Sequence, residues 1–360
     1  MLAGFNIAHA QADKIILGQS AAFTGPAAQL GIQFHQGAKV YFDQVNAQGG
    51  IGKRLIEIRN LDDGYEPDRC AENTRKLIAD DVFALFGYIG TPTSVVALPL
   101  ATKDKVPFIA PFTGAMALRD PFNKFAFHVR ASYNDETGLI VKQLTGLGLK
   151  KIAVFYQNDA YGKAGLDGVN LALAAQNLKP VALATVERNT VNVAAAVKTL
   201  VAAGPDAVVQ IGAYKACAAF IREARKAGYG GTFYNVSFVG TQALADELGK
   251  DGAGVVVSQV MPSPYNAARP IAREFVDAAK AANAQVNFSS MEGYVAAKVL
   301  VDGLKRGGAA KVSRESLIAG LEGMGSQSLG GFSVSFSPTD HVASSFVELS
   351  MLTGDGRVRT

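Results

Sequence analysis

Hydroxyl side chains and glycines gather in two short segments of the first third of the chain. Residues 87–94, GYIGTPTS, join a predicted strand to a predicted helix, with Thr91 as the N-cap and Pro92 as the first helical residue. A helix N-terminus leaves N–H groups without intrahelical partners, here those of Thr93 and Ser94, beside the Thr91 hydroxyl. These donors predict a carboxylate-binding turn. The alternative is that Thr91 only caps its own helix.

A second turn of the same kind, PFTGA at 111–115, follows the next predicted strand. Both turns are expected at the carboxyl ends of parallel strands, where open α/β sheets bind their ligands. Two such turns facing each other would form one anion site, to which Phe112, Thr113 and Gly114 would contribute. The alternative is that Phe112 belongs to the core and Thr113 only caps a helix.

Three further strand-to-helix loops, at 156–162, 212–215 and 235–240, contain tyrosines or directly follow one. A phenol ring can cover the apolar part of a ligand while its hydroxyl bonds to a polar atom. The candidate ligand-binding residues of these loops are Tyr161, Tyr214, Ser237 and Phe238.

The sequence carries none of the motifs that would indicate catalysis or a cofactor. It has no GxxxxGK[ST] phosphate loop, no GxGxxG after a strand, no GxSxG elbow and no HExxH. Its four histidines show no metal spacing. We therefore predict no catalytic residue, no metal and no cofactor.

Composition excludes two broad classes of protein. With 35 Lys+Arg against 31 Asp+Glu, the net charge of +4 argues against a nucleic-acid binder that acts through a basic face. Hydrophobic residues make up 49%, which excludes a disordered chain. Cys70 and Cys217 lie too far apart for a CxxC pair and are expected to be free thiols.

Short apolar segments alternate with amphipathic ones along the chain, which is typical of parallel sheets covered by helices on both faces. There are too many strands for one core, so two doubly wound α/β lobes are predicted, joined where the chain crosses between them. The predicted strands are 15–17, 55–61, 82–86, 106–110, 152–156, 181–186, 207–211, 232–236, 332–336 and 345–352. The predicted helices are 30–45, 67–79, 94–101, 134–147, 193–203, 216–227, 269–282, 290–305 and 313–322, with one more after Gly162.

The first twelve residues, MLAGFNIAHAQA, carry no charged residue and contain two small-x-small patterns, Ala8-His9-Ala10 and Ala10-Gln11-Ala12. We interpret 1–12 as the remaining part of an export signal and exclude it from the fold. The alternative is an ordinary frayed N-terminus. The sequence contains no run of 18 apolar residues, which is about the length needed to span a membrane.

From about Lys14 to the C-terminus, the chain resembles the bacterial branched-chain amino-acid binding proteins. The resemblance rests on the order of several motifs: 20–31 with Thr24-Gly25-Pro26, 46–52, Asp62-Asp63, 90–94, 157–162 and Gly323-Met324. These are type I periplasmic binding proteins, which deliver solutes to importers of the ATP-binding cassette (ABC) class. The resemblance implies a monomer in the periplasm whose partners are a small ligand and a membrane permease. It also implies two lobes, 13–130 plus 262–336 and 131–261 plus 337–360, joined by a three-crossing hinge and closing on the ligand.

The resemblance also assigns roles to single residues. Thr91 matches the residue that holds the ligand carboxylate by its hydroxyl and N–H, and 112–114 matches the second clamp, with Thr113 one place early. Tyr161 and Tyr214 match the tyrosines of the second lobe. Besides the shifted Thr113, four positions depart from the family pattern, and one of them is Ser237. Leu30 stands where an aromatic residue is expected, and Tyr65 and Gly90 stand where the first disulfide is expected.

Ser237 is the departure that bears on the ligand, because the amino-acid binders have an acidic residue there to pair with the ligand ammonium. Leaving a buried ammonium unpaired costs about 3–5 kcal/mol. We therefore predict a small aromatic or short aliphatic carboxylate without an essential amine, with Phe112, Tyr133 and Phe238 as apolar walls. The alternatives are a branched-chain amino acid, if Asp159 or Glu292 supplies the charge, a sensory module of the same fold, and an α/β enzyme.

Overall fold

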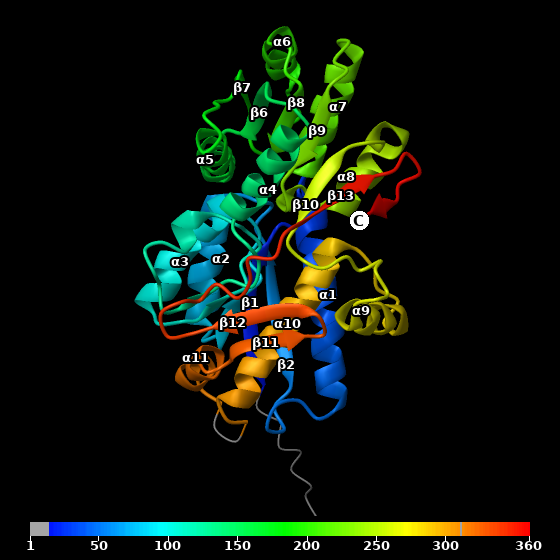
Figure 1. Ribbon diagram of the computed structural model, residues 1–360. Helices are drawn as coiled ribbons and strands as arrows, with labels where there is room; N and C mark the ends of the chain where they lie inside the picture. Colours follow the sequence, from blue (N-terminus) through cyan, green and yellow to red (C-terminus); the bar gives the residue numbers. More distant parts are fainter. Residues whose placement is uncertain (1–13, 310–311) are drawn as a thin grey trace, which may run out of the picture.

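The computed structural model describes residues 14–309 and 312–360, so the predicted export segment 1–12 lies outside the described residues. The chain forms two α/β halves built on separate sheets and stacked end to end (Figure 1). The half with the five-stranded sheet is called lobe 1 below, and the half with the seven-stranded sheet is called lobe 2. The predicted fold class, two α/β lobes with parallel sheets, is confirmed.

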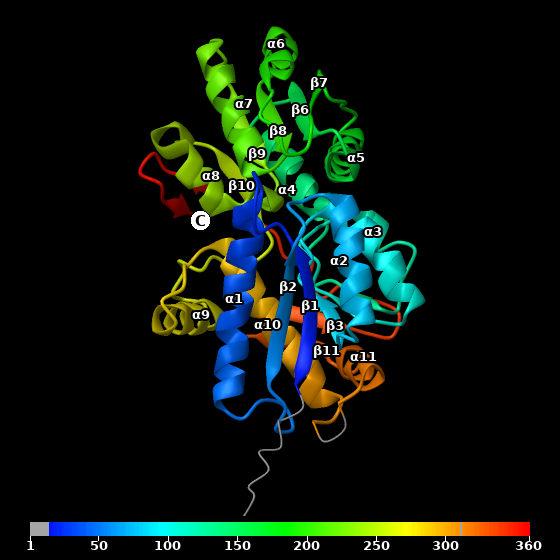
Figure 2. The ribbon, with the colours of Figure 1, turned by 180° about the vertical axis from the view of Figure 1, so that it is seen from behind.

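The sheet of lobe 1 has five parallel strands in the order β2-β1-β3-β4-β5. Figure 2 shows α1 on one side of β1 and β2 and α2 on the other. A separate antiparallel pair, β11-β12, lies across the lobe. The elements of lobe 1 are β1 (Ile15–Ala21), α1 (Ala28–Ala47), β2 (Ile56–Asp62), α2 (Pro67–Ala79), β3 (Ala84–Phe86), α3 (Thr91–Lys103), β4 (Phe108–Ile109), η1 (Met116–Leu118), β5 (Ala126–Phe127), α9 (Pro270–Ala281), α10 (Phe288–Arg306), α11 (Arg314–Glu322), β11 (Gly325–Leu329) and β12 (Phe332–Phe336).

Glycines allow α1 and α10 to pack closely. A Cβ atom at Gly37 would lie 1.8 Å from the carbonyl oxygen of Ser290, and one at Gly293 would lie 2.0 Å from that of Phe34. No side chain fits at either position, because the atom that it would meet belongs to the backbone and cannot rotate away. This contact fixes α10 against lobe 1, and α10 carries one residue of the candidate site, Glu292.

The sheet of lobe 2 has the order β14-β13-β10-β9-β8-β6-β7. The strands β6 to β10 are parallel, whereas β13 and β14 run antiparallel to their neighbours, so the sheet is mixed at this edge. The elements of lobe 2 are α4 (Tyr133–Gly146), β6 (Ile152–Gln157), α5 (Ala160–Ala174), β7 (Leu183–Val186), α6 (Ala194–Ala202), β8 (Ala207–Ile211), α7 (Tyr214–Lys226), β9 (Thr232–Asn235), η2 (Ser237–Val239), α8 (Thr241–Leu248), η3 (Gly249–Gly252), β10 (Val256–Gln259), β13 (Glu348–Leu352) and β14 (Val358–Arg359).

The chain passes between the lobes three times, after β5, after β10 and after β12, as the resemblance implied. The first and third crossings pair with each other. The N–H of His128 donates to the carbonyl of His341 (2.8 Å), and the N–H of Ala343 donates to that of His128 (2.8 Å). Since the crossings are segments several residues long, the predicted limits of the two lobes stay a prediction.

Both cysteines are free and buried, which confirms the prediction for Cys70 and Cys217. Among the helices of 14–309 and 312–360, none has both the length and the apolar character needed to cross a membrane.

Candidate ligand-binding site

The turn after β3 differs in one respect from its predicted form. Helix α3 begins at Thr91, so Gly90 and not Thr91 is the N-cap, and the hydroxyl of Thr91 makes no capping bond. Gly90 has a φ of 96°, and a Cβ there would lie 2.3 Å from a ring carbon of Tyr65, so this position requires glycine. The N–H of Ser94 donates to the carbonyl of Gly90 (3.1 Å) and is not free, contrary to the prediction. The N–H of Thr93 has no acceptor among the described residues.

The two predicted turns lie side by side because β3 and β4 are neighbours in the sheet. The N–H of Gly90 donates to the carbonyl of Phe112 (3.2 Å), and that of Phe112 donates to the carbonyl of Tyr88 (2.7 Å). The hydroxyls of Thr91 and Thr113 share a hydrogen bond of 2.7 Å, in which either oxygen can be the donor. Since only one of the two protons is used in this bond, the other is available to a ligand.

Gly114 connects this pair of turns to the start of α4. Its carbonyl accepts the N–H of Tyr133 (2.8 Å), and a Cβ at Gly114 would lie 2.6 Å from that nitrogen. Tyr133 is the first residue of α4, whose N-terminus is capped by Ser132 and Asp135. Burial raises the pKa of Tyr133 to about 12, so the phenol is protonated at neutral pH. Its hydroxyl is buried and has no partner among the described residues.

Aromatic rings from both lobes close over these turns. The ring of Tyr161 lies 5.4 Å from that of Tyr133 and 4.5 Å from that of Phe238, measured between centroids. Phe238 in turn lies 5.7 Å from Phe112 and 5.8 Å from Tyr65, both of lobe 1. The hydroxyl of Tyr161 is a second buried group without a partner in the described part of the chain.

Eight of the nine residues predicted for the site are connected by these contacts or line one cavity with Phe112, and Tyr214 is the exception. It begins α7, and its hydroxyl accepts the N–H of Gln29 at 3.5 Å, next to Leu30 at the start of α1. Tyr214 thus joins lobe 2 to lobe 1 and makes none of the ring contacts described above.

Ser237 is bonded to an acidic residue that the sequence interpretation missed, Glu136. The N–H of Ser237 donates to Oε2 of Glu136 (2.7 Å), its hydroxyl donates to Oε1 (3.0 Å), and Ser258 donates to Oε2 (2.5 Å). Burial raises the pKa of Glu136, while Arg130 and these three hydrogen bonds act to lower it. An acid therefore does lie next to Ser237, and it is neither of the two substitutes considered above, Asp159 and Glu292.

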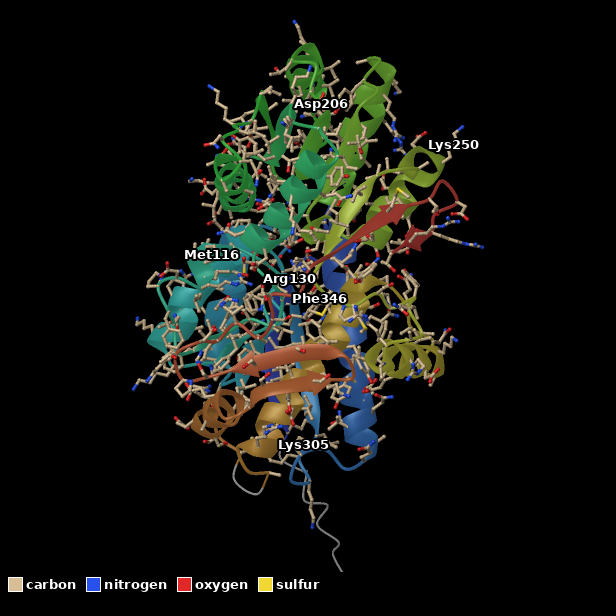
Figure 3. The ribbon with its side chains drawn as sticks, viewed as in Figure 1. Met116, Arg130, Asp206, Lys250, Lys305 and Phe346 are labelled. Carbon is tan, nitrogen blue, oxygen red and sulfur yellow. The ribbon has the colours of Figure 1, made fainter. Side chains whose placement is uncertain are left out.

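Arg130 is the second missed residue. It lies in the first crossing, near the middle of the molecule in Figure 3, and binds Glu292 of α10 through two hydrogen bonds of 2.8 Å. Its guanidinium carbon also lies 4.2 Å from the centre of the Phe112 ring. Nη1 of Arg130 is buried and unpartnered within the described residues. Because this pairing occupies Glu292, that residue is not free to bind an ammonium group, contrary to one alternative above.

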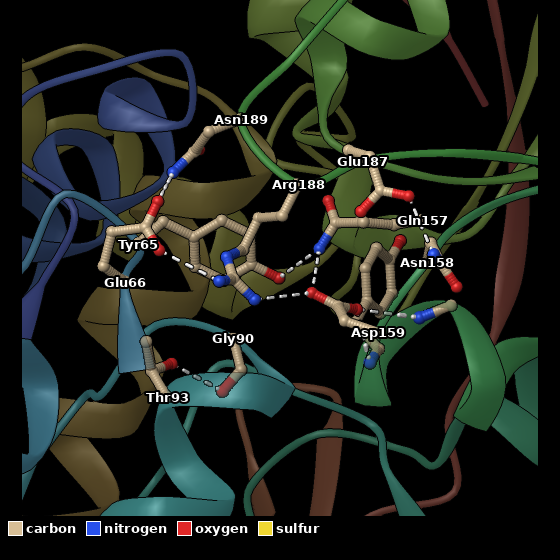
Figure 4. A network of polar contacts seen from close by, with 12 residues as sticks. Tyr65, Glu66, Gly90, Thr93, Gln157, Asn158, Asp159, Glu187, Arg188 and Asn189 are labelled. Carbon is tan, nitrogen blue, oxygen red and sulfur yellow. Dashed lines mark hydrogen bonds and ion pairs between the residues drawn. The ribbon is translucent and has the colours of Figure 1, made fainter. Parts of the chain in front are cut away.

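Asp159, the other proposed substitute, is also occupied. Its carboxylate accepts the N–H of Tyr161 (2.9 Å) at the start of α5 and pairs with Arg188 at 3.2 Å. Arg188 reaches across to Glu66 of lobe 1 (2.9 Å), and the adjacent Asn189 donates to the same carboxylate (2.7 Å) (Figure 4). These contacts hold the two lobes together at the edge of the site.

One cavity where the lobes meet is small. It has a volume of about 10 Å³ and is bordered by Phe112, Arg130, Ser237, Phe288 and Glu292, among others. That volume holds about one water molecule. Together with the ring contacts of Phe238 to Phe112 and Tyr65, it indicates that the lobes are closed here. The described residues contain no group of three His, Cys, Asp or Glu side chains that could hold a metal ion.

A pattern in the sequence could have revealed Glu136. The buried positions of α4 are Tyr133, Glu136, Thr137, Ile140, Val141 and Leu144, which form one stripe at helical spacing. A charged residue on such a stripe needs a polar function, because burial of an unpaired carboxylate is unfavourable. Arg130 gave no comparable signal, since its partner lies 162 positions away in the chain.

Comparison with known proteins gives a consistent result. A family model described as "periplasmic binding protein" matches residues 14–356. Leu/Ile/Val-binding protein homolog 7 of Brucella suis biovar 1 is 27% identical over 328 residues, which are 85% of this chain and 80% of that protein.

Two solved structures are similar over nearly the whole chain. A possible leucine/isoleucine/valine-binding protein from Rhodopirellula baltica has a TM-score of 0.91 and 35% identity, covering 97% of this chain and 96% of that one. A substrate-binding periplasmic protein from Ralstonia solanacearum has a TM-score of 0.89 and 30% identity, covering 96% and 99%.

Proposed function

Because this chain belongs to the periplasmic binding protein family, we propose that it is the solute-binding component of an ABC importer and captures a small carboxylate between its lobes. One observation carries the ligand class. Three buried donors that find no partner in the described part of the chain, Tyr133 Oη, Tyr161 Oη and Arg130 Nη1, belong to residues that lie where the lobes meet. Each unmet buried donor costs about 1–3 kcal/mol, and carboxylate oxygens would satisfy all three. The relatives reported above are binding proteins, and the proposal involves no reaction.

Lobe 1 provides the first contacts in this proposal. The hydroxyl pair of Thr91 and Thr113 offers one free proton, and the N–H groups of Thr93 and Gly114 have no acceptor among the described residues. All four groups lie on the turns that follow β3 and β4. A carboxylate bound there sits at the carboxyl end of the parallel sheet, next to Tyr133.

Closure of lobe 2 then completes the site. Tyr161 and Phe238 move over the bound ligand, and Arg188 reaches Glu66. The ligand favours the closed form only by as much as its contacts with that form exceed those with the open form. The permease of the importer would receive the closed, loaded protein in the periplasm.

An α-amino acid is the second candidate ligand, and Glu136 favours it. Arg130 is paired with Glu292 and not with Glu136. No cationic side chain of the described residues lies within ion-pair distance of Glu136. A ligand ammonium at Ser237 would lie next to this unpaired carboxylate. Against this, the carboxylate already accepts three hydrogen bonds, and burial raises its pKa. The plain carboxylate therefore remains the first candidate.

A ligand panel tests the function. Protein unfolded and refolded to remove bound ligand is mixed with leucine, isoleucine and valine, with their deaminated acids, and with benzoate and phenylacetate. A ligand at 100 times its Kd stabilises the fold by about 2.7 kcal/mol, which gives a clear increase in Tm. If no member of the panel at millimolar concentration raises Tm, the proposed carboxylate function is wrong.

The variant Glu136→Gln decides between the two ligand classes. An amino-acid ligand would lose roughly two to three decades of affinity, because its ammonium loses the buried charge. A plain carboxylate would bind the variant as well as it binds the wild type, or better. Asp167→Asn is the control, since Asp167 forms only a surface pair with Lys163.

A further inference from the structure

Arg119 lies directly behind the turn that carries Thr113 and Gly114, just after η1. Its guanidinium contacts four backbone carbonyls and joins two parts of the site. Nη1 donates to the carbonyls of Thr113 (3.3 Å) and Ala115 (3.0 Å) in the turn. Nη2 donates to those of Arg130 (3.1 Å) and Ala131 (3.4 Å) in the first crossing between the lobes.

The charge of Arg119 has no counter-charge in contact. No carboxylate of residues 14–309 or 312–360 lies within ion-pair distance of its guanidinium. The carboxylates of Asp135 and Glu136, whose charges act on Arg119, are bound to Ser132 and Ser237. Burial and the charge of Arg130 lower the pKa of Arg119 to about 10, so it stays protonated at neutral pH. A partly buried positive charge therefore lies behind the site, and its hydrogen-bond partners are four backbone carbonyls.

The contacts of Arg119 also fix the orientation of the peptide groups in this turn. The carbonyls of Thr113 and Ala115 point at Arg119, and that of Gly114 points at the N–H of Tyr133. In a trans peptide the C=O and the next N–H point in opposite directions. The N–H of Gly114 belongs to the peptide whose oxygen binds Arg119, so it points away from Arg119 and has no acceptor in the described chain.

We propose that Arg119 is a positioning and specificity-determining residue of the ligand site. By holding the carbonyls of Thr113 and Ala115, it turns the N–H of Gly114 toward the ligand, and its unpaired charge selects an anionic group over a neutral one of the same shape. Arg119 itself does not touch the ligand. The inference rests on the proposed carboxylate function and adds the source of its charge selectivity.

A purely mechanical role for Arg119 predicts a different result from a charge-selecting role. If Arg119 only tied the turn to the crossing, its loss would weaken acids and their carboxamides equally. A charge that is partly shielded from water changes the affinity of the acid alone, by about tenfold or more. The ratio of the two affinities therefore separates the two roles.

The experiment measures this ratio by calorimetry for three pairs: leucine with leucinamide, 4-methylpentanoate with 4-methylpentanamide, and phenylacetate with phenylacetamide. The variants are Arg119→Gln and Arg119→Met, which are neutral, and Arg119→Lys, which keeps the charge. Arg314→Met is the matched control, because Arg314 also binds lobe 1 carbonyls, those of Val82 and Phe83, away from the site.

We expect the wild type to prefer the acid, and both neutral variants to lose at least tenfold of that preference. Arg119→Lys keeps the preference within about threefold, even where both affinities fall, and the control leaves both affinities unchanged. If Arg119→Met does not fold by circular dichroism, Arg119→Gln, which keeps a donor for the carbonyls, carries the comparison. An unchanged ratio in a folded neutral variant overturns the role of Arg119 but leaves the proposed function intact. A wild type that binds no acid overturns both.

Discussion

At the scale of single residues, the hydroxyls of Thr91 and Thr113 act together. Either one can donate their common hydrogen bond, which leaves the proton of the other for the ligand. We expect Thr91→Ala to lose about 1–3 kcal/mol of ligand binding, since it removes a hydrogen bond to a charged group. Thr91→Ser should keep most of the affinity. Calorimetry with the tightest ligand of the panel measures both variants. Thr145→Ala, which removes a hydroxyl bonded within α4, is the control. Equal affinity of Thr91→Ala and the wild type would remove Thr91 from the site.

Asp63 gives a pH dependence that does not involve the ligand. It is fully buried and accepts hydrogen bonds from Ser20 (2.7 Å) and from the N–H of Tyr65 (2.8 Å), and burial raises its pKa to about 6. Below about pH 4 the folded and unfolded states both hold the proton, so Asp63 costs nothing there. Between about pH 4 and pH 6 only the unfolded state ionises, and the free energy of unfolding falls as pH rises.

Asp63→Asn should therefore be more stable than the wild type at pH 7, by up to about 3 kcal/mol, and equally stable near pH 4. Urea unfolding at pH 4, 5, 6 and 7 measures the difference, which isolates Asp63 because all other groups are the same in both proteins. A difference that does not change with pH would mean that the pKa of Asp63 is not raised.

Most of the site residues that were predicted from the sequence lie where a strand or a helix ends. Thr91, Thr113 and Ser237 follow β3, β4 and β9, so the rule for parallel sheets was sufficient to find them. Arg130 and its pairing with Glu292 could not be found in this way, because the ion pair depends on how α10 packs against the first crossing. The exact place of the α3 cap was missed because Gly90 accepts a positive φ more readily than Thr91 would.

At the element scale, prediction depended on how apolar each segment is. Helix α2 has its predicted limits, Pro67–Ala79, because proline marks its start. Strand β10 was given no predicted limits, since its last residues are polar. Ser258 and Gln259 are buried all the same, and their side chains bond to Glu136 and to Thr241 and Ser350. A strand that buries polar side chains has no apolar pattern for sequence analysis to detect.

The close packing of α1 and α10 leads to a prediction about two helical glycines. Gly293→Ala places a Cβ 2.0 Å from a backbone oxygen of α1, so we expect a loss of about 1–3 kcal/mol or more in the free energy of unfolding. Gly138→Ala in α4 meets open space and should instead stabilise the protein by about 0.5–1 kcal/mol, because alanine favours helix. Urea unfolding of both variants is the measurement. If Gly293→Ala were as stable as Gly138→Ala, the two helices could separate without cost.

At the scale of the whole molecule, the number of lobes and crossings could be predicted, but the degree of closure could not. Lobes follow from the count of strands and from the resemblance, which are properties of the chain. Closure depends on a few contacts between residues far apart in sequence, such as Arg188 with Glu66 and Gln157 with Tyr65. Each of these contacts is weak alone, so no strong sequence pattern accompanies them.

Arg188 is the residue whose removal should reveal the opening of the lobes. It is partly exposed and pairs with Glu66 of lobe 1 and Asp159 of lobe 2, contacts that are worth up to about 1 kcal/mol each at such a position. We expect Arg188→Ala to shift the ligand-free protein toward the open form and to weaken ligand binding severalfold, while Tm changes little. Arg222→Ala is the matched control, because Arg222 bonds only within lobe 2, to Asp251 and Glu247. Small-angle scattering should then give a larger radius of gyration for ligand-free Arg188→Ala than for the control. Because a saturating ligand adds contacts that only the closed form makes, it should return both proteins to the same radius. A ligand-free Arg188→Ala as compact as the control would show that the aromatic cluster alone keeps the lobes closed.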